Sequence, residues 1–347
     1  MRPSLWTLGT SSPTHAAEAA RRAEDAGWDG MAVVDSQNLS GDAYVALAMA
    51  AAATSTLRLG TGVTNPVTRH PAVAASAAGS IQALSGGRMH LGIGRGDSSL
   101  AHLGRAPAPV AALERHLVAL QRYLAGEEVP FDELDFHERL APPVATLGLA
   151  DAPSASAVAW LPGRHPKVPV EVAATGPRVI EVAARHADRV VLAVGADPER
   201  VRWGVETARA VDPDVAVAAY VNLVCHRDLD VARTLVSGGL ATFARFSVMH
   251  GVATGPTSDE QSEVLARIHR LYDMTRHTQV GARQAEALTP GFVDRFAIVG
   301  PPERCLDRLD ELGSLGVDRV VVVGPTAGAD RHAVRASLQL LRDEVLA

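Results

Sequence analysis

The sequence contains few of the residues and motifs that form nucleic-acid, membrane and metal sites. Aromatic residues make up 4% of the 347 residues and the formal net charge is −6, so platforms for stacking bases are few and a basic stripe is missing. The longest apolar run, 43–53, is well short of the ~20 residues that span a bilayer. No H-E-x-x-H or H-x-x-E-H spacing occurs, which predicts no metal site. We expect neither nucleic acid nor a membrane as a partner.

Cysteine is also scarce. Cys225 and Cys305 are the two cysteines of the chain, and they form neither a C-x-x-C motif nor a metal-binding spacing. The first residues, MRPSLWTLGTSSP, lack the apolar stretch of a secretory signal. This pattern predicts a reduced, cytoplasmic protein.

The chain does contain a regular alternation of short apolar runs and longer helical patterns. Runs rich in Val, Ile and Leu predict eight strands, at 5–9, 30–34, 57–61, 88–94, 168–173, 189–194, 215–224 and 317–323. Helices are expected at 14–26, 42–54, 71–84, 107–124, 177–187, 198–210, 228–245, 258–274, 302–312 and 329–346, with 281–296 irregular or partly helical. Near-continuous apolar strands are typical of parallel sheets buried on both faces. The order predicts a (β/α)₈ TIM barrel with insertions, and a doubly wound open sheet is the alternative.

Two segments interrupt the alternation within a single predicted domain, 1–347. Residues 126–166 are rich in proline and weakly periodic, and 245–295 are only partly periodic. We expect the first to be an insertion on the strand face, and both to cover the site. We expect core packing, with pocket lining as the alternative role, for Trp160, Phe243, Phe246 and Tyr272.

Polar clusters follow four of the first five predicted strands, where the active sites of barrels lie. They are 35–38, 62–66, 95–97 and 174–177. Arg95 beside Gly96 offers a bidentate donor and free backbone N–H groups to an anion. Thr175 and Gly176 open a helix, whose N-terminus offers further N–H groups to a phosphate. In the alternative interpretation Arg95 pairs with Asp97 or Asp35, and Thr175 only caps the helix.

Other motifs are excluded or remain open. Gly92, Gly94 and Gly96 form G-x-G-x-G, which is not the dinucleotide-binding G-x-G-x-x-G. No G-x-S-x-G occurs, which argues against a serine hydrolase. Glu171 lies inside a predicted strand and needs a partner if buried, for which Arg95 is one candidate. His70, before Pro71, and His102, after the fourth strand, are more typical of polar loop residues than of catalysts.

Two long stretches carry a family resemblance. Residues 57–104, LRLGTGVTNPVTRHPAVAASAAGSIQALSGGRMHLGIGRGDSSLAHLG, resemble the bacterial luciferase-like family, and more closely its coenzyme F420-dependent branch, typified by methylenetetrahydromethanopterin reductase. Residues 168–192, VPVEVAATGPRVIEVAARHADRVVL, extend the match. The resemblance implies a TIM barrel and is specific for the family rather than for a substrate.

The resemblance also implies site residues. Gly62-Val63 matches a non-proline cis peptide behind the deazaflavin ring. Arg95, Gly96 and Asp97 match the strand-four segment that meets the cofactor, where flavin-using relatives bind phosphate through the arginine and some F420 relatives use the acid as proton donor. Ala174, Thr175 and Gly176 match a second contacting segment. The cofactor-binding candidates are Asp35, Ser36, Gly62, Val63, Asn65, Arg95, Gly96, Asp97, Ala174, Thr175 and Gly176.

Asp35 and Ser36 match a strand-two pair that often contains a catalytic histidine, which is absent here. This departure leaves Asp35, Asp97 and His70 as candidates for proton transfer, and it argues against a light-emitting monooxygenase. The resemblance implies hydride transfer between the deazaflavin C5 and a small organic substrate. The alternatives are an FMN-dependent monooxygenase, which needs a flavin reductase partner, and a non-catalytic flavin-binding barrel. A homodimer is expected through barrel helices, with the small-residue-rich 43–53 allowing close packing.

Overall fold

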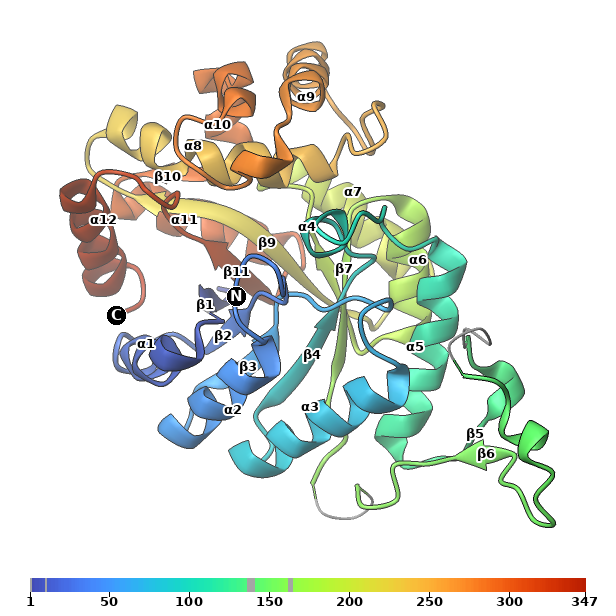
Figure 1. Cartoon of the computed structure of the whole chain (residues 1–347). Helices are drawn as coiled ribbons and strands as arrows, with labels where there is room; N and C mark the ends of the chain where they lie inside the picture. Colours follow the sequence, from blue (N-terminus) through green and yellow to red (C-terminus); the bar gives the residue numbers. More distant parts are fainter. Residues whose placement is uncertain (1, 10, 136–140, 162–164) are drawn as a thin grey trace.

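A closed ring of parallel strands forms the centre of the protein (Figure 1). The computed structural model describes residues 2–9, 11–135, 141–161 and 165–347. The ring follows the order β1-β2-β3-β4-β7-β8-β9-β11, and β11 pairs with β1 to close it. The strands are β1 (Ser4–Gly9), β2 (Gly30–Val33), β3 (Arg58–Thr61), β4 (Met89–Ile93), β7 (Val170–Ala174), β8 (Arg189–Leu192), β9 (Ala216–Cys225) and β11 (Arg319–Val323). The predicted TIM barrel is confirmed, and the open sheet is excluded.

Helices surround the ring, and one group lies over its end. The outer helices are α1 (Pro13–Asp25), α2 (Ala43–Ala53), α3 (Pro71–Ser85), α5 (Val110–Ala125), α6 (Pro177–His186), α7 (Pro198–Arg209), α11 (Pro302–Ser314) and α12 (Arg331–Glu344). The additional elements are α4 (Ser98–Ala101), α8 (Leu229–Phe246), α9 (Asp259–Leu271), α10 (Pro290–Phe296) and β10 (Ile298–Gly300), which pairs with the end of β9. Proline begins several of these helices because its missing N–H is one of the donors that would have no partner in the first turn anyway. Across the described ranges, no helix has the length and apolarity needed to cross a bilayer.

The barrel interior differs between its two ends. Toward the amino ends of the strands it holds large and charged side chains, among them Trp6 and Arg319, whose guanidinium lies 4.0 Å from the Trp6 ring centroid. Toward the carboxyl ends it includes the small residues Ala32 and Ala173, beside which the Tyr220 hydroxyl and Leu8 approach Gly62. Because active sites of barrels lie at the carboxyl ends, the small residues leave room where a ligand would bind.

Glu171 belongs to the amino-end cluster, so the expectation that Arg95 is its partner is wrong. The Glu171 Oε1 atom lies 2.5 Å from Arg319 Nη1 and 2.9 Å from His90 Nδ1. Glu171 lies near the start of β7, whereas Arg95 follows the end of β4 at the opposite rim. Burial alone would raise the pKa of Glu171, but the hydrogen bond from His90 and the charge of Arg319 lower it to about 2.

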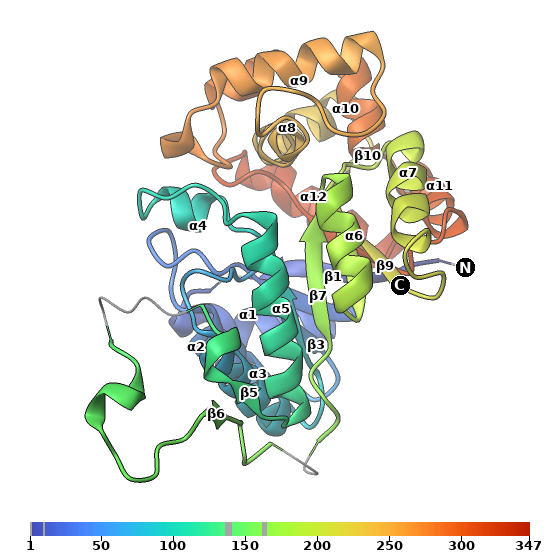
Figure 2. The same ribbon diagram turned by 90° about the vertical axis from the view of Figure 1, so that its right-hand side faces the viewer.

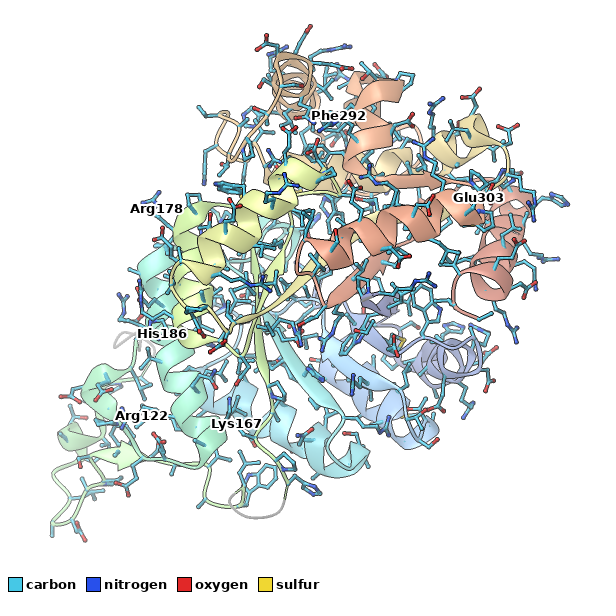
Figure 3. All side chains as sticks on the ribbon, turned by 180° about the vertical axis from the view of Figure 1, so that it is seen from behind. Arg122, Lys167, Arg178, His186, Phe292 and Glu303 are labelled. Carbon is cyan, nitrogen blue, oxygen red and sulfur yellow. The ribbon has the colours of Figure 1, made fainter. Side chains whose placement is uncertain are left out.

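The two insertions lie at opposite ends of the barrel. The described parts of 126–166 hold the hairpin β5 (Val129–Pro130) and β6 (Ala155–Ser156) and the 3₁₀ turns η1 (Phe131–Glu133) and η2 (Val144–Leu147), while 136–140 and 162–164 lie outside the described residues. Tyr123 Oη is 2.8 Å from Ser156 Oγ, which fixes the hairpin beside α5. Figure 2 shows β7 pointing toward α8 and α9, with the hairpin at the far end of α5. Figure 3 likewise places Arg122 and Lys167 far from Phe292 of α10.

The expectation that 126–166 covers the site is therefore wrong. A helix that follows a barrel strand returns to the amino ends of the strands, so a segment entered from the end of α5 starts at the rim away from the site. The second insertion is placed as expected. Residues 247–297, called the roof segment below, lie with α8 over the carboxyl ends (Figure 2).

We predict that Glu171→Gln lowers the free energy of unfolding by about 3–5 kcal/mol at pH 7, because it leaves the buried Arg319 without a negative partner. The folded-state pKa of Glu171 is depressed, so its stabilisation is complete above its ordinary pKa and is lost as pH falls toward about 2. Urea unfolding from pH 7 to pH 3 should show the gap between wild type and variant narrowing below about pH 4.5. A gap that stays constant would contradict this assignment.

Candidate functional site

Side chains tie together the loops that follow β2, β3 and β4. Asp35 is buried, and its Oδ2 accepts hydrogen bonds from Thr64 Oγ1 at 2.7 Å and Arg69 Nη1 at 2.9 Å. Asn65 Oδ1 accepts from the N–H groups of residues 67 and 68, both at 3.0 Å. Ser36 Oγ lies 3.4 Å from Ser98 Oγ, on the loop after β4. Two of the four predicted polar clusters, 35–38 and 62–66, are therefore joined directly, and Ser98, the residue after the third cluster, contacts the first.

The end of β3 carries the cis peptide bond Gly62–Val63 that the family resemblance implies, and this expectation is confirmed. The Val63 side chain lies across β4, where a Cβ on Gly94 would be 3.1 Å from Val63 Cγ2. A Cβ on Gly92 would be 2.1 Å from the Thr61 carbonyl oxygen. The glycines of the G-x-G pattern thus allow β3 and Val63 to approach β4 closely. The same close approach leaves little side-chain bulk on this wall of the barrel.

Asp97 forms an ion pair with the helix above it. Both carboxylate oxygens accept from Arg245 Nη1 of α8 at 2.8 Å. Arg95 instead donates from Nε to the Ala108 carbonyl oxygen at 2.5 Å. The alternative interpretation, in which Arg95 pairs with Asp97 or Asp35, is therefore wrong. The backbone turns at Gly96, whose φ is +84°. The side chains of Arg95 and Asp97, on either side of it, therefore bond to different parts of the chain.

A cationic patch lies where α6 begins. Gly176 is the residue before its first turn, and the Thr175 hydroxyl donates to the Ala193 carbonyl oxygen at 3.3 Å, so the alternative in which Thr175 only caps the helix is wrong. Burial and the charge of Arg178 both lower the pKa of Arg95. Among the described residues, neither arginine has a carboxylate partner. Arg178 lies at the edge of the molecule in Figure 3. Two uncompensated guanidinium groups beside a helix N-terminus favour an anion.

Arg200 of α7 anchors the roof segment above this patch. It is fully buried and donates to the carbonyl oxygens of Val194 at 2.9 Å, Pro256 at 2.8 Å and Thr254 at 2.8 Å. Its Nη2 also donates to Ser247 Oγ at 2.9 Å. The Thr254 methyl group would lie 3.5 Å from a Cβ on Gly176. Arg200 thus holds the start of the roof segment directly over the start of α6.

Sequence analysis missed Arg245 and His277. Arg245 stacks its guanidinium 4.3 Å from the centroid of the Tyr272 ring, and Tyr272 Oη lies 2.6 Å from His277 Nδ1. Tyr272 was a candidate for lining the site, and here it lies in contact with the ion pair of Asp97. Neither Arg245 nor His277 is part of a motif, and a local pattern gives no signal for contacts between segments this far apart.

The remaining candidates lie elsewhere or contribute to packing. His70 Nδ1 accepts from the Ala72 N–H at 3.2 Å, so His70 caps α3, and its ring lies 6.3 Å from that of Tyr123 on α5. Burial lowers the pKa of His70. The Phe243 ring lies 5.9 Å from that of Tyr220 inside the barrel and 5.4 Å from that of Phe246. Trp160 lines a hollow of about 190 Å³ beside the ends of α3 and α5, so the alternative that it lines the site is wrong.

Comparison with known proteins identifies the family. A family model described as luciferase-like monooxygenase matches residues 1–319, so the chain belongs to this family. It is 26% identical over 332 residues to a 5,10-methylenetetrahydromethanopterin reductase from Methanolobus tindarius, covering 92% of this chain and 93% of the relative. It is 28% identical over 340 residues to the protein of that name from Archaeoglobus fulgidus, covering 93% and 92%.

The fold likeness extends over the whole chain. The solved structure of coenzyme F420-dependent tetrahydromethanopterin reductase from Methanopyrus kandleri aligns with a TM-score of 0.71, at 21% identity, over 99% of this chain and 98% of that one. Within the described part of the chain, no group of three or more His, Cys, Asp or Glu side chains could hold a metal ion.

We predict that Arg200→Lys loosens the roof segment, because lysine cannot make all of the bonds of the guanidinium fork and leaves buried carbonyl oxygens unpaired. The expected loss of unfolding free energy is about 1–3 kcal/mol. Hydrogen exchange read by mass spectrometry should quicken at 247–256, and Arg202→Lys, an exposed change on the same helix, should leave it unaltered. Equal exchange in the two variants would contradict the anchoring role.

Proposed function

We propose that the protein is a coenzyme F420-dependent oxidoreductase that transfers a hydride between the deazaflavin and a small organic substrate. Membership of the luciferase-like family supports a flavin-type cofactor on this barrel. The two curated relatives described above, matched over more than nine-tenths of their length, are named as 5,10-methylenetetrahydromethanopterin reductases. We also infer a cytoplasmic location, since Cys225 and Cys305 are free, buried thiols.

The observation that carries the proposal is the pair of uncompensated cations at the start of α6. F420 bears a phosphate, and the residues present fit an anion of this kind. Arg95 and Arg178 would hold the phosphate together with the N–H groups at the N-terminus of α6, beside Thr175 and Gly176. Ala174, the last residue of β7, leads into this segment.

The barrel wall fits a flat ring system. Gly62 and Val63 at the end of β3 and the glycines of β4 present little side-chain bulk, and these residues would lie behind the ring. Asp35, Ser36, Asn65, Gly96 and Asp97 form the adjoining rim and are proposed as further contacts. When bound, the cofactor supplies a carbon centre that donates or accepts a hydride.

Asp35, Asp97 and His70 are the candidates for proton transfer that the sequence indicates. Asp35 and Asp97 lie at this rim, each paired with an arginine. His70 contacts α3 and α5 instead. An FMN-dependent monooxygenase is the second candidate function, favoured by the description of the family itself, and it would need a flavin reductase and O₂. A barrel that binds a flavin without catalysis is the third.

We further propose that the protein forms a homodimer through α2 and α3. Large apolar side chains are exposed on these neighbouring helices, with Val45 50%, Met49 47% and Val73 54% exposed. Val45 and Met49 are four residues apart and share one face of α2, and the alanines around them would let a partner helix approach closely.

Arg95→Ala should weaken F420 binding by about tenfold or more, because a charge-assisted hydrogen bond contributes about 1.5–3 kcal/mol. Fluorescence titration of the apo protein with F420 measures the Kd. Arg202→Ala, which removes an exposed arginine from α7, should leave the Kd unchanged. If Arg95→Ala binds F420 as tightly as wild type, the phosphate assignment is wrong.

The double variant Val45→Asp/Met49→Asp should be monomeric where the wild type is dimeric, because two carboxylates would have to be desolvated at the interface. Light scattering coupled to gel filtration gives the mass of each. Leu338→Asp on α12, where the leucine is 47% exposed, should not change the mass. A dimer that survives the double change would exclude α2 as the interface.

A further inference from the structure

The two cysteines lie on either side of the place where the chain enters and leaves the roof. Cys225 is the last residue of β9, and α8 begins shortly after it. After the roof segment the chain returns through β10, and Cys305 lies in the first turn of α11. Residues 223–229 and 298–305, called the neck below, therefore carry both connections of α8 and the roof segment to the barrel.

Backbone pairing in the neck brings the two cysteines to the same carbonyl group. Gly300 of β10 is the register partner of Cys225, and its carbonyl oxygen accepts from the His226 N–H at 2.8 Å. The Cys305 Sγ atom lies 3.5 Å from the same oxygen. Because His226 is covalently bonded to Cys225, these two contacts place the Cys305 thiol beside the end of β9.

The two side chains project into the same layer, between the barrel and its helices. Along β9, Ala218 and Tyr220 line the barrel interior, so the alternation of a strand directs Cys225 outward, toward the helices. Cys305 lies with Leu309 on the buried face of α11. Both cysteines are fully buried free thiols, and both belong to the core cluster that fills this layer. The two thiols therefore face each other where α11 packs on β9.

The electrostatics of the pair agree with this geometry. The neighbouring Cys305 lowers the pKa of Cys225, whereas the neighbouring Cys225, together with burial, raises the pKa of Cys305. Burial and the charges of Glu303 and Glu344 oppose the lowering at Cys225, and the charge of Arg227 assists it. Cys225 is therefore the thiol that ionises first, and the thiolate is the nucleophilic form.

The pair lies beneath a thin layer of the protein. His226 is half-buried and Arg227 is exposed, directly after Cys225. Glu303 is exposed at the start of α11, two residues before Cys305 (Figure 3). A local opening of the first turn of α11 would admit a peroxide molecule, which is little larger than water.

We propose that Cys225 and Cys305 form a peroxide-sensitive site at which oxidation makes a disulfide across the neck. The Cys225 thiolate attacks the peroxide: an S–O bond forms, the O–O bond breaks, and the departing hydroxide takes up the thiol proton as water. The Cys305 thiol then attacks the sulfenic sulfur: an S–S bond forms, the S–O bond breaks, and hydroxide leaves with the second thiol proton as water. Two electrons pass from the sulfur atoms to the peroxide.

The disulfide would fasten the roof at its base. Without it, β9 and β10 are held together through three register pairs. Oxidation would restrict α8 and the roof segment to the arrangement in which Arg245 pairs with Asp97. A transient disulfide is typical of redox sensing in the cytoplasm, where we infer that the protein lies. The site is independent of the cofactor and substrate assigned above.

Mass spectrometry of the intact wild-type protein tests the site directly, since the chain has no third cysteine. After hydrogen peroxide treatment under native conditions we expect a monomer that has lost two hydrogen atoms. Its digest should contain the peptides of Cys225 and Cys305 joined together, and dithiothreitol should restore the original mass. In urea, where the fold no longer holds the thiols together, the disulfide should form more slowly.

Single variants separate the two chemical steps. Cys305→Ser should stop at a sulfenic acid on Cys225, which dimedone traps, whereas Cys225→Ser should leave Cys305 unoxidised under the same treatment. Hydrogen exchange of the oxidised wild type should slow at 223–229 and 298–305 and stay unaltered at 129–135, in the distant hairpin.

Three results would overturn the inference. The first is a wild-type mass unchanged by peroxide, or oxygen added to either cysteine without a link between them. The second is a disulfide that forms as fast in urea as in the folded protein. The third is a disulfide that leaves hydrogen exchange at the neck unaltered.

Discussion

The ion pair between Asp97 and Arg245 is the contact on which the site depends. It joins side chains 148 residues apart, one on the loop after β4 and the other on α8. Both members are largely shielded from water, which makes a broken pair costly because either charge alone would remain poorly solvated. The pair fixes the end of α8 over the barrel, and the Tyr272 ring packs on the same guanidinium. Arg200 secures the other side of the roof segment through carbonyl oxygens.

The residues that stabilise the barrel and the residues proposed for its chemistry lie at opposite ends of the barrel axis. Its amino end is closed by Glu171, Arg319, His90 and Trp6, a layer in which each charge is compensated inside the ring. Its carboxyl end includes glycine and alanine positions beside the Tyr220 and Phe243 rings, and is surrounded by charges that belong to loops and helices. Two of these charges, on Arg95 and Arg178, have no negative partner in the described part of the chain. The charges at the amino end pair with one another and need no ligand, whereas the unpaired positive charges at the carboxyl end favour binding of an anion.

Most of the fold could be predicted from the sequence because the eight strands are short apolar runs, each followed by a helix. The strand-end clusters were found for the same reason, since barrel geometry places them on one rim. Pairings were not predictable: the alternative in which Arg95 meets Asp97 or Asp35 is wrong, because Asp97 bonds to Arg245 and Asp35 to Arg69. The position of 126–166 was predicted wrongly. Its composition indicates that it is an insertion, but the end of the barrel at which it lies depends on the direction of α5, which composition does not reveal. No local sequence pattern around His277 indicates that it lies at the site.

The most direct test of the account is a fluorescence titration of the purified apo protein with F420 and, separately, with FMN. The account predicts tight binding of F420 and weak binding of FMN, since the relatives matched along more than nine-tenths of their length are named as 5,10-methylenetetrahydromethanopterin reductases, which typify the F420-dependent branch of the family. Tight binding of FMN with weak binding of F420 would contradict it and would indicate an oxygen-using flavin monooxygenase instead.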